Sequence, residues 1–199
     1  MIVLSVNPEN FGAVAEKAVR ALRKGKVLVC PTDTVYGLIA DATNAEAVRK
    51  IFQIKGREKG KPIPIFVKDI ASARKLAKIA NGKENFLKKV WPGKVTVVLP
   101  SKGKLPQELG TSQTIGLRIP NYDLIDCLLK ALNKPLTGTS ANLSGAPSLS
   151  DSKEIIAQFK PRTYRPDMII DAGVLPPSLP STVVDFTGKK RKILRKGAA

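Results

Sequence analysis

Short apolar runs alternate with amphipathic segments along most of this chain. The run Val27–Cys30 has no polar position, which is typical of a strand buried on both faces of a sheet. The segment 45–55 instead repeats its apolar side chains every three to four residues, as a helix with one buried face does. This alternation of two patterns favours an α/β fold built from layers of strands and helices.

Polar residues that commonly cap helices precede several of the amphipathic segments. Asn7 stands directly before Pro8, and Asn44 and Asp69 precede later segments in a similar way. These signals predict helices over 8–24, 45–55, 70–79, 85–90, 123–132 and 153–159. The apolar runs predict strands over 2–6, 26–30, 64–67, 95–99, 115–119, 135–138, 168–171, 182–186 and 192–195.

Several of these strands are joined by connections too short to hold a helix, which indicates mixed strand directions. We therefore predict an α/β fold with one twisted, open, mixed sheet and flanking helices. The proline-rich stretch 174–181 could be a linker, but too little chain follows it to form a domain. Residues 1–199 are thus expected to form a single domain, with no additional C-terminal domain.

Composition narrows the chemistry that this chain can perform. The chain has no histidine and two cysteines, which excludes histidine-based acid–base catalysis and argues against a zinc site. We expect no zinc, haem or flavin, and we interpret Cys30 and Cys127 as buried, reduced thiols. No apolar stretch is long enough to cross a bilayer and the N-terminus lacks a signal-peptide pattern, so we predict a cytoplasmic protein without a membrane partner.

The net charge of +18 indicates an anionic partner. Nucleotides, nucleic acids and anionic membranes would all satisfy this charge. Aromatic residues make up only 5% of the chain, which is poor material for stacking single-stranded bases. The run KKRK at 189–192 is most simply a solvated turn, with contact to tRNA as the alternative.

The basic loop KGREKGKP, residues 55–62, partly resembles a P-loop. Its spacing is one residue short, and Pro62 stands where the P-loop needs a hydroxyl, so we reject that motif. Lys55 and Arg57 follow the last turn of a predicted helix and can point back toward the sheet, where they could bind phosphate. A solvated loop is the alternative.

Hydroxyl-rich loops and isolated cations recur at the ends of predicted strands. The loop 137–145 is rich in Ser and Thr, 180–182 repeats the pattern, and 31–38 (PTDTVYGL) is either a tight turn or part of a site. Arg118 stands in an apolar strand and needs an anionic partner, either a structural carboxylate or a ligand. Patterning alone predicts a protein that binds phosphate-bearing ligands by positioning and electrostatics.

Six motifs in order resemble those of the YrdC-type threonylcarbamoyl-AMP synthase family: PTDTVYGL, the KGR loop, WPGKVT, GLRIP, TSANLSG and STVVD. The resemblance covers about Ser5 to Arg195 and implies a twisted α/β sheet with a concave, positively charged face. It implies synthesis of L-threonylcarbamoyl-AMP and diphosphate from L-threonine, bicarbonate and ATP, with Mg²⁺ carried by ATP. The threonylcarbamoyl transferase machinery would then modify tRNA, and tRNA itself is a further expected partner.

The resemblance also assigns roles to residues, position by position. The catalytic pair near the ATP phosphates would be Lys55 and Arg57. The residues expected to bind threonine are Thr34, Tyr36, Arg118 and Ser181. Those expected to bind ATP are Arg57, Lys61, Thr114, Ser140, Asn142, Ser148 and Arg195.

This chain departs from the family pattern at two positions, and two other functions stay open. Many members have asparagine at the position of Lys61 and histidine at that of Phe66, so Phe66 is left out of the predicted polar site. The first alternative is a non-catalytic YrdC-like protein that binds tRNA or double-stranded RNA through the same basic face. The second is an enzyme that forms a carbamoyl adenylate from another carbamoyl donor.

Overall fold

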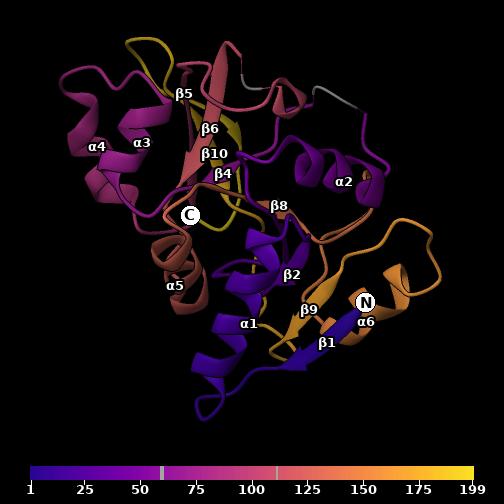
Figure 1. The fold of residues 1–199 in the computed structure, drawn as a ribbon. Coiled ribbons are helices and arrows are strands. Elements are labelled where there is room, and N and C mark those ends of the chain that lie inside the picture. Colours follow the sequence, from indigo (N-terminus) through magenta and orange to yellow (C-terminus); the bar gives the residue numbers. More distant parts are fainter. Residues whose placement is uncertain (59–60, 111) are drawn as a thin grey trace.

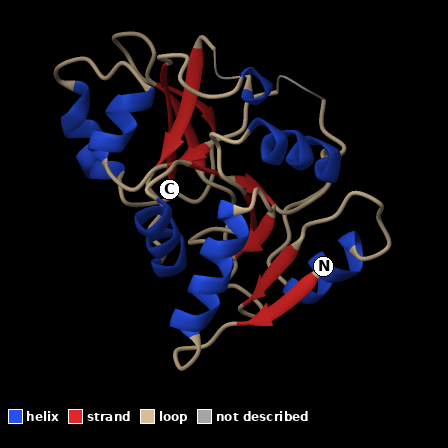
Figure 2. Cartoon of the chain, viewed as in Figure 1, coloured by secondary structure: helices blue, strands red, loops and turns tan. Residues whose placement is uncertain are grey.

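The computed structural model describes residues 1–58, 61–110 and 112–199 (Figure 1). Its strands are β1 (Ile2–Ser5), β2 (Leu28–Cys30), β3 (Gly37–Ile39), β4 (Ile65–Phe66), β5 (Val95–Pro100), β6 (Thr114–Arg118), β7 (Leu136–Thr137), β8 (Thr139–Ser140), β9 (Met168–Asp171), β10 (Thr182–Asp185) and β11 (Lys192–Arg195). Its helices are α1 (Phe11–Arg23), α2 (Ala45–Lys55), α3 (Ile70–Leu76), α4 (Lys83–Val90), α5 (Asp123–Leu132), α6 (Ser152–Phe159) and a 3₁₀-helix at Gln107–Leu109. The helices lie on the outer sides of the strands (Figure 2), which confirms the predicted mixed α/β class.

The strands form two sheets, and this corrects the prediction of a single open sheet. The five-stranded sheet has the order β1-β9-β2-β3-β8, and the six-stranded sheet has the order β11-β10-β5-β6-β4-β7. Each sheet contains both parallel and antiparallel pairs, so the predicted mixture of strand directions is confirmed. Pairing between distant strands decides how many sheets form, and the pattern along one strand does not report it.

The chain crosses from one sheet to the other at Gly138. On one side of this residue β7 pairs with β4, and on the other side β8 pairs with β3. The Gly138 amide also donates to the carbonyl of Pro64 at 2.8 Å, which ties the crossing point to the start of β4. The end of each sheet is thereby held against the other.

Side chains that alternate along the strands of the five-stranded sheet pack into an apolar cluster on each of its two faces. Leu28, Cys30 and Ile170 belong to the apolar cluster formed with α1 and α5. Val29 and Ile169, the neighbours that point to the opposite face, belong to the cluster that includes α2 and α6. β2 is fully buried, as its continuous apolar run predicts.

The six-stranded sheet uses the same alternation for a different purpose. Leu99, Ile115 and Leu117 of β5 and β6 pack in the core together with side chains of α3 and α4. The alternate residues of β6, Gly116 and Arg118, point to the other face of the sheet and line a cavity. Arg118, the isolated cation of β6, therefore lies on the face of the sheet that lines the cavity.

The predicted helices are found, with differences at their ends. α2 and α5 match their predicted bounds, and the Asn44 side chain caps α2 by accepting from the amides of Glu46 and Ala47. α1 begins at Phe11 and not at Pro8, because the side chains of Asn7 and Asn10 accept from each other's amides and hold a turn there.

Two further predictions concern local structure. The segment that contains β3 is predicted to be a loop, but β3 pairs antiparallel with β2, so residues 31–36 are the connection of a β-hairpin.

Gly60 of the basic loop lies outside the described residues, as do residues 59 and 111. Cys30 is buried, whereas Cys127 is only half-buried, and both are free thiols. Among the helices that the structure describes, none combines the length and the apolar character needed to cross a membrane.

The α6 helix offers a test of core packing. Phe159 is fully buried between α6 and the five-stranded sheet, so Phe159→Ala should lower the free energy of unfolding by about 3–5 kcal/mol. Tyr164→Ala, at a side chain that is 54% exposed, should change it by less than about 0.5 kcal/mol. Urea denaturation followed by circular dichroism measures both, and equal losses in the two variants would contradict this packing.

Candidate active site

A cavity of about 440 Å³ lies where the two sheets meet. Its walls come from the connection after β2, the C-terminal end of α2, the uncovered faces of β5 and β6, the loop after β8, and the start of β10 with the end of β11. These segments are far apart in the sequence, and the crossing at Gly138 brings them together.

The cavity collects most of the residues predicted for the site. The predicted residues that line it are Thr34, Tyr36, Lys55, Arg57, Thr114, Arg118, Ser140, Asn142, Ser181 and Arg195. Two others do not line it. Lys61 has an exposed side chain whose ammonium pairs with Glu58 at 2.9 Å, and Ser148 is half-buried in the loop before α6. Their contact with ATP stays a prediction.

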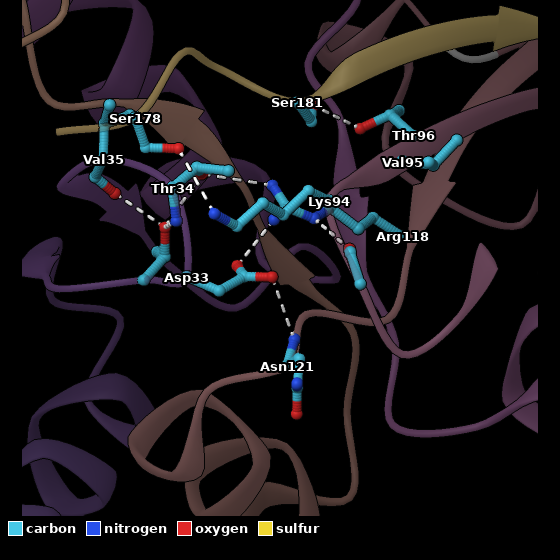
Figure 3. Close-up of polar contacts among 12 residues, drawn as sticks. Asp33, Thr34, Val35, Lys94, Val95, Thr96, Arg118, Asn121, Ser178 and Ser181 are labelled. Atoms are coloured by element: carbon cyan, nitrogen blue, oxygen red, sulfur yellow. Dashed lines mark hydrogen bonds and ion pairs between the residues drawn. The ribbon is translucent and has the colours of Figure 1, made fainter. Parts of the chain in front are cut away.

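Arg118 is held by three neighbours (Figure 3). Its Nη2 pairs with Asp33 Oδ1 at 2.5 Å, its Nε donates to the Gly93 carbonyl at 2.9 Å, and its Nη1 donates to Thr34 Oγ1 at 3.3 Å. Both charged side chains are buried. Burial lowers the pKa of Arg118, and the Asp33 charge opposes this effect. The anionic partner that the sequence predicts for Arg118 is thus the structural carboxylate of Asp33, and the Arg118 side chain still lines the cavity.

The hydroxyls of Thr32 and Thr34 form a directed chain. Thr32 Oγ1 donates to the Val35 carbonyl at 2.7 Å, which uses its only proton. Its contact of 3.1 Å with Thr34 Oγ1 must therefore be donated by Thr34. Because Thr34 Oγ1 also accepts from Arg118, it can offer a ligand one further acceptor position and no proton.

Tyr36 lines the cavity, but its hydroxyl is committed elsewhere. The phenol donates to the Gly173 carbonyl at 2.8 Å and accepts from the Ala172 amide at 3.0 Å. Burial raises the pKa of Tyr36 to about 12, so the hydroxyl keeps its proton. In this geometry Tyr36 shapes the wall and ties it to the end of β9.

Lys55 holds the loop that follows β8. Its ammonium donates to the Ser140 carbonyl at 2.6 Å, to the Asn142 carbonyl at 2.8 Å and to Asn142 Oδ1 at 3.1 Å. A lysine ammonium has three donors, so all of them are used by the end of β8 and the loop that follows it. In return, the Lys55 carbonyl accepts from the Ser144 amide at 2.8 Å. The end of α2 and the hydroxyl-rich loop therefore form one unit.

Arg57, in contrast, has few hydrogen-bond partners among the described residues. α2 ends at Gly56, whose positive φ of 58° turns the chain so that Arg57 lines the cavity. The guanidinium donates only to the Pro62 carbonyl, at 3.3 Å, and its buried Nε has no partner among the described residues. A guanidinium with open donors at a cavity wall is suited to an anion.

The far wall is formed by Ser181, Thr96 and Arg195. The hydroxyls of Ser181 and Thr96 are 2.9 Å apart (Figure 3). Arg195 donates to the Ser181 carbonyl through Nη2 at 2.7 Å and through Nε at 3.1 Å. Burial lowers the pKa of Arg195, although the side chain is less enclosed than that of Arg118.

Phe66 is a wall residue that the predicted polar site left out. Its ring lies 5.7 Å from the Arg118 guanidinium and close to Gly138. A Cβ at position 138 would lie 2.3 Å from the ring, so only glycine fits beside it. Thr96 was also missed, although the alternation along β5 places it on the same face as the predicted residues of β6.

The walls of the cavity have the chemistry that suits an anionic ligand, in a protein of the mixed α/β class. The lining contains cations, hydroxyls and backbone groups, and none of the described lining residues is Asp or Glu. No group of three or more potential metal ligands occurs among the described residues. The wall groups are mainly hydrogen-bond donors and cations, which suit the oxygens of an anion.

The chain belongs to the Sua5/YciO/YrdC family, whose model, described as telomere recombination, matches residues 20–197. This confirms the resemblance found in the motifs. A putative threonylcarbamoyl-AMP synthase of Methanocaldococcus jannaschii is 34% identical over 98% of this chain and 91% of its own length.

Two solved structures are similar over nearly the whole chain. P. abyssi Sua5 complexed with L-threonine matches with a TM-score of 0.87 at 32% identity, over 98% of this chain and 57% of the other. E. coli YciO matches with a TM-score of 0.86 at 28% identity, over 100% of this chain and 95% of the other. The chain thus spans little more than half of the Sua5 chain.

The buried Lys55 ammonium predicts a pH dependence of stability. Burial, followed by the nearby Arg57 charge, lowers its pKa to about 8. An unfolded lysine titrates near ~10.4, so between these values the unfolded chain binds more protons and the free energy of unfolding rises with pH. The contribution should be about 1–3 kcal/mol.

Lys55→Met and Lys55→Arg both remove the group that titrates in this range, so each should lack that rise. Chemical denaturation of the three proteins at pH 8 and pH 10 measures it. Parallel pH profiles for wild type and both variants would show that Lys55 does not titrate here.

Proposed function

We propose that the protein is an L-threonylcarbamoyladenylate synthase. In this reaction L-threonine, bicarbonate and ATP give L-threonylcarbamoyl-AMP and diphosphate, as the first step in forming N6-threonylcarbamoyladenosine in tRNA. The observation that carries the proposal is the match over 98% of the chain to a Sua5 structure complexed with L-threonine, with the cavity residues described above. The transfer machinery would then consume the product in the cytoplasm.

The walls suggest how the substrates would be divided. Threonine would lie near Arg118, Thr34 and Ser181, where two hydroxyls and a guanidinium can bind its polar groups. ATP would lie near Arg57 and Arg195 and against the loop at Ser140, with Thr114 and Asn142 at its edges. Mg²⁺ would arrive with the ATP phosphates and share the negative charge of the leaving group.

The chemistry needs little covalent participation by the protein. The threonine amine would take up carbon dioxide from bicarbonate, forming an N-carboxy group with release of water. An oxygen of that group would attack the α-phosphorus of ATP, and diphosphate would leave with the electrons of the broken bond. Positioning and charge stabilisation would supply most of the acceleration. Arg57 suits this role because it lines the cavity and, among the described residues, donates only to the Pro62 carbonyl.

The proposed reaction predicts diphosphate release that requires threonine, bicarbonate and ATP together. A coupled diphosphate assay with each substrate omitted in turn measures this requirement. Serine and carbamoyl phosphate, added in place of threonine and bicarbonate, should support little release. Release that persists without threonine would disprove the proposal, and turnover with carbamoyl phosphate would favour an enzyme with another carbamoyl donor.

Arg57→Ala should lower this rate by about 10²-fold or more if its guanidinium stabilises developing phosphate charge. Arg49→Ala is a control, because Arg49 lies on α2, which ends just before Arg57, but pairs with Glu108 at 2.7 Å and does not line the cavity. It should change the rate less than about twofold. A comparable loss in both variants would remove Arg57 from the site.

RNA binding is a second candidate function, and a specific surface favours it. A hollow of about 560 Å³ lies between α4 and the turn that joins β10 to β11. Arg191 stacks over Phe86 at 4.5 Å, which holds its guanidinium in place. Among the described residues, none of the lining cations Lys89, Lys189, Lys190 and Arg191 pairs with a carboxylate. Such a surface fits a phosphate backbone.

If this surface binds tRNA, Lys189→Ala with Lys190→Ala should weaken binding and reduce the salt slope of log K by about 2. Filter binding of a tRNA transcript at several salt concentrations measures the slope. Lys17→Ala with Lys24→Ala is the control, because both residues are exposed, in or directly after α1, and α1 lies apart from α4 (Figure 1). Equal slopes for the two double variants would exclude the hollow as an RNA site.

A further inference from the structure

Asp33 lies just behind the wall of the cavity. Its chain neighbours Thr32 and Thr34 line the cavity, but Asp33 itself does not. The Asp33 carboxylate is only 7% exposed. Its two oxygens have separate partners: Oδ1 accepts from Arg118 Nη2 at 2.5 Å and Oδ2 accepts from the Asn121 amide at 3.1 Å (Figure 3). The carboxylate therefore faces protein donors and not the cavity.

The contacts of Arg118 leave part of the guanidinium unused. A guanidinium carries five N–H donors. Three of them meet Asp33, Gly93 and Thr34, so two have no partner among the described residues. One face of the group lies toward the Phe66 ring at 5.7 Å. The plane of the guanidinium is thus set on several sides, while donors stay available at the cavity.

We infer that Asp33 is a positioning residue for the amino-acid substrate, because it orients the Arg118 guanidinium so that its free donors meet the substrate carboxylate. This inference rests on the proposed function, which places threonine at Arg118. Asp33 would not touch the substrate. It would act through Arg118, and through Arg118 also on Thr34, whose hydroxyl accepts from the same guanidinium.

Charge and geometry both require a carboxylate at position 33. A buried guanidinium without an anionic partner is strongly unfavourable, so Asp33 keeps the cation in the wall before any substrate arrives. Asp33 Oδ2 accepts from the backbone amide of Asn121, a residue just beyond Arg118 in the chain. This bond ties the connection after β2 to the segment that follows β6. The hairpin connection and the strand that carries the cation are therefore held in register by one side chain.

A direct chemical role for Asp33, such as accepting a proton from threonine, does not fit the geometry. Both oxygens already accept from protein donors, and the residue is absent from the cavity wall. A group that removes a proton must come within hydrogen-bonding distance of it. Arg118, which pairs with Asp33, lines the cavity, whereas Asp33 does not.

Asp33→Asn tests the inference with almost no change of shape. Asparagine offers one acceptor oxygen, so its NH₂ group must face either the Arg118 guanidinium or the Asn121 amide, both of which are donors. The KM for threonine and the Kd from calorimetry should rise about tenfold or more, whereas the KM for ATP should stay within about twofold.

Asp41→Asn is the matched control for general loss of stability. Asp41 is similarly buried, and its oxygens accept from the Lys134 ammonium at 2.7 Å and from the Thr43 amide and hydroxyl at 2.8 and 2.6 Å, so the variant also weakens one cationic and one backbone contact. It lies outside the cavity wall. It should be destabilised in thermal denaturation as Asp33→Asn is, but keep its threonine KM.

Asp33→Glu provides a second variant should Asp33→Asn fail to fold. It keeps the charge and both acceptors but moves them by one methylene, so its threonine KM should lie between those of wild type and Asp33→Asn. An unchanged threonine KM in a folded Asp33 variant, or equal rises in the KM values for threonine and ATP, would overturn the inference. If the wild-type protein itself neither binds threonine nor releases diphosphate with it, the proposed function fails instead.

Discussion

The crossing of the chain at Gly138 is the constraint on which the cavity depends. The residues on either side of it pair with strands of different sheets, so the two sheets are joined at one short segment. The Phe66 ring occupies the space that a side chain at position 138 would need. Because the sheets meet at this point, walls contributed by both of them enclose one cavity.

Within this cavity the cations divide into two kinds. Lys55 and Arg118 are buried and held by protein acceptors, so their positions are set before a ligand arrives. Arg57 and Arg195 are more exposed, and Arg57 donates only to the Pro62 carbonyl among the residues that the structure describes. Groups held in advance cost little reorganisation when a ligand binds, which is the physical advantage of electrostatic preorganisation. Lys55 has all its donors engaged by the protein, Arg118 keeps two for a ligand from a fixed position, and the second kind is more exposed to the charge of a ligand.

Much of the fold and of the candidate site could be predicted because the signals are local. The Asn44 cap and the apolar period of the following segment predict α2 with its observed bounds. Hydroxyls and cations at strand ends predict most of the cavity wall. Lys61 has the same local features as Arg57, yet its side chain pairs with Glu58 outside the wall. Local composition cannot distinguish these two cases, because the direction of the chain after Gly56 decides them.

The sequence by itself determined most of the strands and helices, though not β3. It also determined that a buried cation at position 118 needs an anion, and which family motifs are present. Only the tertiary structure decided that the strands form two sheets and that Asp33 is the anion. The partner of Arg118 lies 85 residues earlier in the chain. Pairings of this kind depend on the register of strands that meet only after folding, and no periodicity along the chain encodes them.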